Sequence, residues 1–250
     1  MKILRKILIN ILGFEYYLIL ISKVFIFLIK LGFFKNKYQE LHNLKKIIKK
    51  GDTCIDIGAN LGYYTHFLLK YVGKSGKVIA IEPIDIFVKV LKKNTSKYNY
   101  NNLTIYNVCL GEKKGFVVMA TPLENNIIRH GKTRVLSNNF DKLSAYKVYN
   151  CKMVKASDLL SNIEKVDYIK IDVEGYELKI IEDLLNIIKK NKPILQIEVA
   201  QENKRALFDI LIKANFFPHK FDKNKFEKLN ENDYLIYEKD IYFLFKDLNE

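Results

Sequence analysis

From Gly51 onward, the chain alternates short apolar runs with longer segments in which apolar residues recur at helical spacing. The apolar runs predict strands at residues 53–57, 77–81, 103–110, 166–171 and 193–199. Other segments predict helices at residues 38–50, 63–72, 85–98, 176–190 and 201–214. Strands that are apolar on both faces and alternate with helices are typical of a parallel sheet covered on both sides. Residues 216–221 and 241–245 predict a pair of strands that closes this sheet.

Residues 1–37 differ from the rest and predict a separate N-terminal helical arm. The first fifty residues contain 11 Lys or Arg and two acids, so they carry +9 of the net charge of +14. Residues 16–29 are apolar except for Ser22 and Lys23. That run is shorter than the roughly twenty residues of a membrane span, and Lys23 would cost about 2.5 to 3.5 kcal/mol to insert. Three roles stay open: binding an anionic membrane surface, packing on the domain or in an oligomer, and spanning the membrane.

The cysteines bear on the compartment. Cys54, Cys109 and Cys151 are odd in number and have no metal-binding spacing, which indicates reduced thiols. No small-residue cleavage site follows the apolar run, so a cleaved signal peptide is not expected. We therefore expect a cytoplasmic protein, with peripheral binding to the inner face of the membrane as an open alternative.

The first predicted strand ends in a glycine-containing turn, CIDIGANLGYY, which includes Asp56, Gly58, Ala59, Asn60 and Gly62. Glycines let backbone N–H groups approach a ligand, and the helix that follows presents a favourable dipole. The second strand ends in Glu82, 24 residues after Gly58, where a carboxylate can accept both hydroxyls of a ribose. The GxGxxG cradle of a pyrophosphate is absent. The turn therefore favours an adenosine cofactor without phosphate, namely S-adenosyl-L-methionine.

The segment VDYIKIDVEGYELKIIEDLL places Asp172 and Glu174 directly after a predicted strand. Ligands of open α/β sheets bind at the carboxyl ends of the strands, so both carboxylates should face the cofactor. We expect them to be catalytic: Asp172 contacts the cofactor's amino group or the acceptor hydroxyl, and Glu174 lines the acceptor pocket. Glu174 could instead cap the following helix. A Mg²⁺ ion bridged by the two acids is open but unsupported, because two ligands are too few to assert a metal site.

Residues 119–153 are polar and interrupt the alternation. They predict an insertion or lid over the ligand edge of the sheet, where long loops commonly select the substrate. His130 in this segment is a candidate base. Glu198, at the end of the strand 193–199, either lines the acceptor site or simply terminates the strand.

Several of these motifs resemble FkbM-type methyltransferases. CIDIGANLGYYT, VIAIEP, NLTIYNVCLGEKKG, YIKIDVEGYELKIIEDL and KPILQIEV occur in the family's order between Gly51 and Val199. The resemblance implies the α/β class I methyltransferase (Rossmann-like) fold: a seven-stranded doubly wound sheet in residues 38–250, with the arm as an N-terminal helical extension. It also implies S-adenosylmethionine-dependent O-methylation. Asp56, Gly58, Asn60 and Gly62 would surround the methionine, Glu82 would hold the ribose, and Cys109–Leu110 would lie near adenine.

The expected function is methyl transfer to a hydroxyl of a small molecule, a sugar or glycan, or a lipid-linked intermediate. A nucleic-acid (RNA) methyltransferase is one alternative, prompted by the positive charge. The Asn/Asp-Pro-Pro-aromatic turn typical of base methylation is absent after residue 171, so no specific nucleic acid is expected. A non-enzymatic membrane-associated adaptor is the other alternative, but it leaves the glycine turn, Glu82 and Asp172 unexplained.

Overall fold

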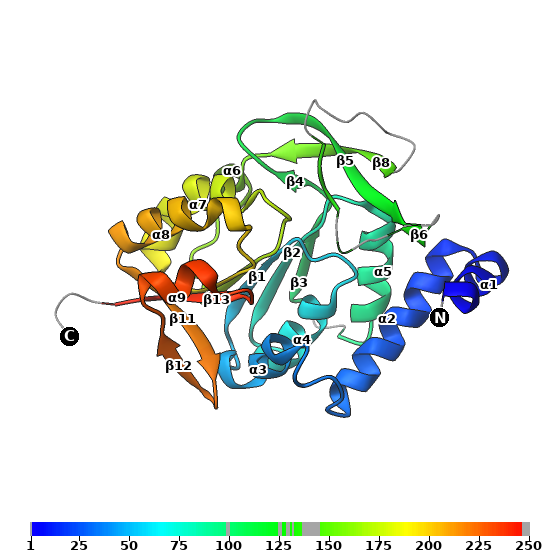
Figure 1. Ribbon diagram of the computed structural model, residues 1–250, viewed down its shortest axis with the longest axis horizontal. Helices are drawn as coiled ribbons and strands as arrows, with labels where there is room; N and C mark the ends of the chain where they lie inside the picture. Colours follow the sequence, from blue (N-terminus) through cyan, green and yellow to red (C-terminus); the bar gives the residue numbers. More distant parts are fainter. Residues whose placement is uncertain are drawn as a thin grey trace.

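The computed structural model describes residues 2–98, 101–124, 127–128, 131, 133–136 and 146–246. Within these residues, the large sheet has eight strands in the order β12-β11-β13-β10-β9-β1-β2-β3 (Figure 1). The strands are β1 (Thr53–Ile57), β2 (Lys77–Ile81), β3 (Leu103–Tyr106), β9 (Tyr168–Ile171), β10 (Ile194–Ile197), β11 (Phe216–Asp222), β12 (Lys225–Lys228) and β13 (Ile241–Phe245). β1, β2, β3, β9 and β10 run parallel, whereas β13 is antiparallel to both β10 and β11.

The expected α/β, doubly wound fold is confirmed, including the closing pair β11 and β13. The strand count differs from seven, because in the described residues β12 pairs with β11 as an eighth strand. Lys223 and Asn224 connect these two strands with positive φ angles of 45° and 72°. That geometry matches the twist of a two-residue hairpin. The short, charged sequence KFEK of β12 carries little apolar pattern, which is why the sequence analysis missed it.

The expected strand 103–110 is divided into two. β3 ends at Tyr106, and the side-chain amide of Asn107 donates to the carbonyl oxygens of Glu82 and Pro83, at 3.0 Å each. The chain then leaves the large sheet, and β4 (Cys109–Leu110) pairs with β8 (Tyr146–Val154). Cys109 and Leu110 therefore belong to a second sheet, held next to the end of β2 by Asn107.

This second sheet contains β4, β8, β5 (Gly115–Glu124) and β6 (Ile127–Ile128), and β7 (Arg134–Val135) also pairs with β5. Its longest part is the antiparallel ribbon of β5 and β8, which lies beyond one end of the large sheet (Figure 1). The ends of the segment 119–153 thus lie in strands rather than in a loop. Met119, Cys151 and Met153 of the ribbon are buried in a cluster with Phe87.

Helices cover both faces of the large sheet. They are α3 (Gln39–Ile47), α4 (Tyr63–Val72), α5 (Asp85–Thr95), α6 (Ala156–Leu159), α7 (Glu177–Asn191), α8 (Lys204–Lys213) and α9 (Glu231–Ile236), with a short 3₁₀ helix at Gln201–Asn203. Alternate residues of β1 show the two layers. Ile55 packs in a cluster with Leu184 of α7, whereas Cys54 packs with Leu44 of α3 and Phe67 of α4. Because successive side chains point to opposite faces, a fully apolar strand needs both layers.

The N-terminal arm consists of α1 (Lys2–Leu12) and α2 (Phe14–Lys30). α2 lies along α5 at the side of the molecule away from the C-terminus (Figure 1). Tyr17 and Leu18 are buried beside Phe87, and Ser22 Oγ donates to Asn94 Oδ1 at 3.1 Å. Among the helices of the described residues, none is both long and apolar enough to cross a bilayer.

Candidate active site

The glycine turn after β1 and the end of β9 are in direct contact. β1 and β9 are neighbours, and the backbone N–H of Asp172 donates to the Ile57 carbonyl oxygen at 3.0 Å. Gly58 has a φ of 81°, and a Cβ placed on it would lie only 1.8 Å from the carbonyl oxygen of Asp172. A side chain is therefore excluded at Gly58, both by its backbone conformation and by this close approach. Two motifs that lie over a hundred residues apart in the sequence meet here through their backbones.

A hollow at the carboxyl ends of β1, β2 and β9 brings together seven of the ten predicted site residues. We call it the Glu82 hollow, and these seven are Gly58, Asn60, Glu82, Cys109, Leu110, Asp172 and Glu174. Phe87, Val108 and Met119 add apolar walls. The hollow therefore has an apolar part, suited to a flat ring, next to carboxylates and backbone groups.

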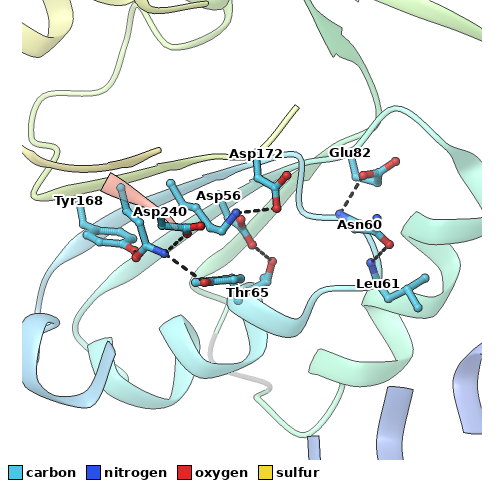
Figure 2. A network of polar contacts seen from close by, with 11 residues as sticks. Asp56, Asn60, Leu61, Thr65, Glu82, Tyr168, Asp172 and Asp240 are labelled. Atoms are coloured by element: carbon cyan, nitrogen blue, oxygen red, sulfur yellow. Dashed lines mark hydrogen bonds and ion pairs between the residues drawn. The ribbon is translucent and has the colours of Figure 1, made fainter. Parts of the chain in front are cut away.

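Glu82 is held in a fixed position at the end of β2. Its Oε2 accepts from the backbone N–H of Asn60 at 2.8 Å (Figure 2). Its Oε1 accepts from the backbone N–H of Ile84, also at 2.8 Å. Burial raises the pKa of Glu82 to about 7, although these two N–H donors act against the shift. A carboxylate has about four lone-pair sites, so two remain after these bonds. Their number matches the two neighbouring hydroxyls of a ribose.

The other predicted residues of the glycine turn have different surroundings. Asp56 is fully buried, and Thr65 Oγ1 donates to its Oδ2 at 2.6 Å (Figure 2). Its Oδ1 has no hydrogen-bond partner among the described residues. Ala59 lines a second hollow with Asp56. Gly62, at the start of α4, instead packs against α5, because an added Cβ would lie 2.7 Å from Leu91 Cγ. Gly62 therefore shapes the turn through helix packing and lines neither hollow.

The second hollow adjoins the first and contains a buried lysine that the sequence analysis missed. We call it the Lys170 hollow; it shares Gly58, Asn60 and Asp172 with the Glu82 hollow. The Lys170 side chain comes from the middle of β9, is only 2% exposed, and places its Nζ 2.8 Å from Asp172 Oδ2. The same ammonium lies 4.4 Å from the centre of the Tyr64 ring. Asp172, one of the two predicted catalytic acids, is thus half of an ion pair.

Three carboxylates surround this lysine. Burial alone would lower the pKa of Lys170, but the charges of Asp172, Asp240 and Asp56 outweigh burial and raise it. Lys170 therefore stays protonated, and its charge opposes the upward pKa shifts that burial causes in Asp56 and Asp240. One cation thus faces three carboxyl groups on the floor of this hollow.

A hydrogen-bond network fixes the far side of the Lys170 hollow (Figure 2). Gln196 of β10 is buried, and its amide nitrogen donates to Asp240 Oδ2 at 2.5 Å and to Tyr64 Oη at 3.0 Å. The hydroxyl of Tyr168 donates to the amide oxygen of the same glutamine. Lys170, Gln196 and Asp240 were absent from the predicted site. The available signal was one strongly polar residue inside each apolar run, Lys170 in YIKI and Gln196 in ILQI.

Glu198, at the end of β10, lines the Lys170 hollow beside Asp172 and Asp240. Burial, followed by the negative charges of Asp172 and Asp240, raises the pKa of Glu198 to about 8. Its carboxylate makes no hydrogen bond or ion pair with the residues that the structure describes. Two roles were left open for Glu198: lining a ligand site or simply terminating the strand. Its position in the wall of the hollow favours the first.

Glu174 has a φ of 53° and lines the Glu82 hollow. The carboxylate that binds backbone N–H at the start of α7 is that of Glu177, which accepts from Gly175 at 2.7 Å and from the Asn203 amide at 3.0 Å. Glu177 is 1% exposed. A carboxylate three positions after Glu174 therefore binds backbone at this helix end.

The described residues contain no group of three or more His, Cys, Asp or Glu side chains placed to hold a metal ion. Asp172 and Glu174 both line the Glu82 hollow, and Asp172 is ion-paired with Lys170. His130, the candidate base in the segment 119–153, lies outside the described residues.

Comparisons with known proteins agree with the fold. A crystal structure of the methyltransferase FkbM from Methylobacillus flagellatus KT has a TM-score of 0.51 at 19% identity, covering 77% of this chain and 43% of that one. A protein-L-isoaspartate O-methyltransferase of Methanococcus vannielii is 34% identical over 58 residues, which are 23% of this chain and 28% of that protein. The ribosomal RNA large subunit methyltransferase E of Buchnera aphidicola is 44% identical over 46 residues, 18% of this chain and 22% of that protein.

The chain therefore spans about a quarter of the length of these two curated relatives. The match to a family profile is far longer: the methyltransferase FkbM domain matches residues 56–235. That range begins at Asp56 in the glycine turn and contains Glu82, Asp172 and Glu198. The chain belongs to the methyltransferase FkbM domain family.

Proposed function

We propose that this protein is an S-adenosylmethionine-dependent O-methyltransferase. The observation that carries the proposal is that Gly58, Glu82 and Asp172, from three separate motifs, line one hollow at the carboxyl ends of adjacent parallel strands. Family membership supports methyl transfer, and an α/β sheet with a ligand site at this edge supports a nucleoside cofactor.

The residues present fit S-adenosylmethionine at three points. Glu82 has two lone-pair sites left for the ribose hydroxyls, and the apolar walls at Phe87 and Leu110 suit adenine. Asp56 Oδ1 is a buried acceptor without a partner in the described residues, which is costly unless a donor such as the methionine ammonium binds it. These points support a binding mode with adenosine in the Glu82 hollow and the methionine where the two hollows join. The acceptor then enters the Lys170 hollow.

When bound, S-adenosylmethionine supplies an electrophilic methyl group on a positively charged sulfur. The chain's own residues position the acceptor and remove its proton. Lys170 fixes the Asp172 carboxylate at 2.8 Å, so Asp172 can orient an acceptor hydroxyl. The pKa of Glu198 is raised to about 8, so this side chain is suited to accept the hydroxyl proton. The proton leaves as the oxygen–carbon bond forms and the carbon–sulfur bond breaks. Asp172 thus keeps a catalytic role as a positioning group for the acceptor, and Glu198 joins it.

A hydroxyl-rich acceptor suits the Lys170 hollow, which presents carboxylates and aromatic side chains such as Tyr63 and Tyr64. We propose a sugar, glycan or lipid-linked intermediate as the acceptor class. Cys54, Cys109 and Cys151 are buried and unpaired, which supports a reducing, cytoplasmic site of action.

Titration calorimetry with S-adenosylmethionine tests the cofactor. The wild-type protein should bind, and Glu82→Ala should bind at least tenfold more weakly, because two charge-assisted hydrogen bonds to the ribose are lost. Glu182→Ala, which removes an exposed carboxylate on α7, is the matched control and should bind normally. Absence of binding by the wild-type protein would end the proposal.

Transfer of a labelled methyl group into lipid, glycan and RNA fractions of cells tests the acceptor. Label should enter the lipid or glycan fraction with the wild-type protein. The Asp172→Asn and Glu198→Gln variants should bind the cofactor but fail to transfer its methyl group. Label in the RNA fraction would instead support the nucleic-acid alternative.

A further inference from the structure

The outer face of α2 is an unbroken apolar stripe. Tyr16, Leu20, Val24, Phe27 and Leu31 are 68%, 43%, 48%, 59% and 58% exposed. Their spacing of three or four residues places them on one side of the helix, opposite the side that packs on α5. A row of large exposed apolar side chains on a soluble surface marks a contact with another apolar phase.

More apolar residues extend the stripe beyond α2 at both ends. Ile7 and Ile11 of α1 are 48% and 73% exposed, and Phe33 and Phe34 after α2 are 54% and 49% exposed. Exposed Lys23 and Lys30 lie beside the stripe on α2. Their long side chains can keep the ammonium in water while the helix face enters an apolar layer.

A basic hollow lies at the C-terminal end of the stripe. It is lined by Lys30, Lys35, Lys45, Lys70 and His42, and Leu31 of the stripe also lines it. No carboxylate is among its lining residues in the part of the chain that the structure describes. Partial burial, with the neighbouring Lys97 and Lys70, lowers the pKa of Lys30 to about 8. Such crowding of ammonium groups is relieved by an anion, and lysine is a good point-charge partner for phosphate.

We propose that this surface docks on an anionic lipid bilayer: the stripe from Tyr16 to Leu31 enters the interfacial layer, and the basic hollow takes the phosphate of a lipid headgroup. The partner is a bilayer rather than a second copy of the chain, because the cations beside the stripe would repel their own copies in a two-fold contact. Apolar side chains combined with flanking lysines are the composition of helices that lie on anionic membranes.

The docked orientation would serve the proposed function. Ile21 and Phe25 of α2, together with Lys37 and Tyr38, also line the Lys170 hollow. The same helix therefore presents its outer face to the bilayer and a flank to the hollow proposed for the acceptor. This link to a lipid-linked acceptor rests on the proposed function, whereas membrane docking itself does not.

Co-sedimentation with vesicles tests the docking without cofactor or acceptor. The full chain should bind phosphatidylcholine vesicles that contain phosphatidylglycerol and bind pure phosphatidylcholine vesicles far more weakly. Phe27→Ser should weaken binding about tenfold, since one aromatic side chain no longer leaves water. Replacing Lys30, Lys35 and Lys45 together by Ala should weaken vesicle binding roughly a hundredfold. Each lysine near an anionic membrane adds its own electrostatic attraction, and three are removed.

Matched controls lie elsewhere on the surface. Phe116→Ser changes a phenylalanine that is 76% exposed on β5, and the triple replacement of Lys189, Lys190 and Lys213 by Ala removes exposed lysines from α7 and α8. Both should bind vesicles like the wild type. Docking is refuted if the wild type ignores anionic vesicles, if the arm variants bind as well as their controls, or if inorganic phosphate at headgroup concentration releases the protein fully. Light scattering that shows a dimer which Phe27→Ser converts to a monomer would also refute it.

Discussion

At the scale of single residues, the site depends on close contacts between groups that are remote in the sequence. Gly58 is the clearest case, because the carbonyl oxygen of Asp172 occupies the space in which a side chain would begin. The glycine that lets the turn approach a ligand thus also sets the distance between the two motifs. Any displacement of Gly58 would move Asp172, and with it the ion pair to Lys170.

Gly58→Ala should destabilise the protein by about 3 kcal/mol or more, since overpacking adds to the cost of a left-handed backbone. Gly13→Ala is the matched control: its φ of 77° is close to the 81° of Gly58, but nothing lies within 4 Å of the added Cβ. With its ψ of 161°, the backbone conformation alone should cost about 1 to 3 kcal/mol, without the added clash. Denaturant unfolding measures both. Equal losses in the two variants would show that the contact with Asp172 is not tight.

Glu82 should make stability depend on pH. Burial raises its pKa from an ordinary 4.5 to about 7, so the folded state holds the proton more tightly than the unfolded state. Raising the pH from about 4.5 to 7 should therefore lower the free energy of unfolding, by about 3 kcal/mol for this group.

The Glu82→Gln variant isolates this contribution, because glutamine does not ionise. The difference in free energy of unfolding between Glu82→Gln and wild type should shift in favour of the variant as the pH rises through that window. Urea unfolding at a series of pH values measures the difference. A difference that stays flat from pH 4.5 to 8 would contradict the raised pKa.

Site residues could be predicted from the sequence where they directly follow a strand. Glu82 and Asp172 were found because a carboxylate directly after an apolar run has few purely structural explanations. Lys170 was not found, because a single lysine inside the run YIKI reads as a surface position. Its partners Asp56, Asp172 and Asp240 come from three parts of the chain, and only the folded sheet brings them together.

At the scale of elements, hydrophobic periodicity predicted most helices and parallel strands within a few residues. It failed where pairing rather than periodicity decides the structure. The apolar run 103–110 looks like one strand, but the hydrogen bonds of the Asn107 amide to Glu82 and Pro83 turn the chain into a second sheet. Nothing local in the sequence reveals which carbonyl groups a single asparagine will bind.

The packing of α2 on α5 yields a prediction at this scale. Leu18 of α2 is fully buried, whereas Leu20 on the same helix is 43% exposed. Leu18→Ala should lower the free energy of unfolding by about 2 to 4 kcal/mol, and Leu20→Ala should change it by less than about 0.5 kcal/mol. Urea unfolding of the two variants measures this. If both behave like the wild type, the arm is not part of the cooperative fold.

At the scale of the whole molecule, the net charge of +14 is informative only through its distribution. Most of it lies in the N-terminal fifty residues, and the structure gathers part of it into a hollow lined by four lysines. The acidic floor around Lys170 is on a different part of the fold. The fold thus separates a hollow lined by four lysines from a hollow lined by several carboxyl groups, and the net charge alone could not reveal this separation.

The two adjoining hollows also differ in how much of the chain each one needs. The lining residues of the Glu82 hollow all fall between Ile57 and Tyr176, whereas those of the Lys170 hollow range from Ile21 to Asp240. During synthesis on the ribosome, the first set has emerged long before the second is complete. A nascent chain would thus contain the whole lining of the Glu82 hollow while the Lys170 hollow still lacked Glu198 and Asp240.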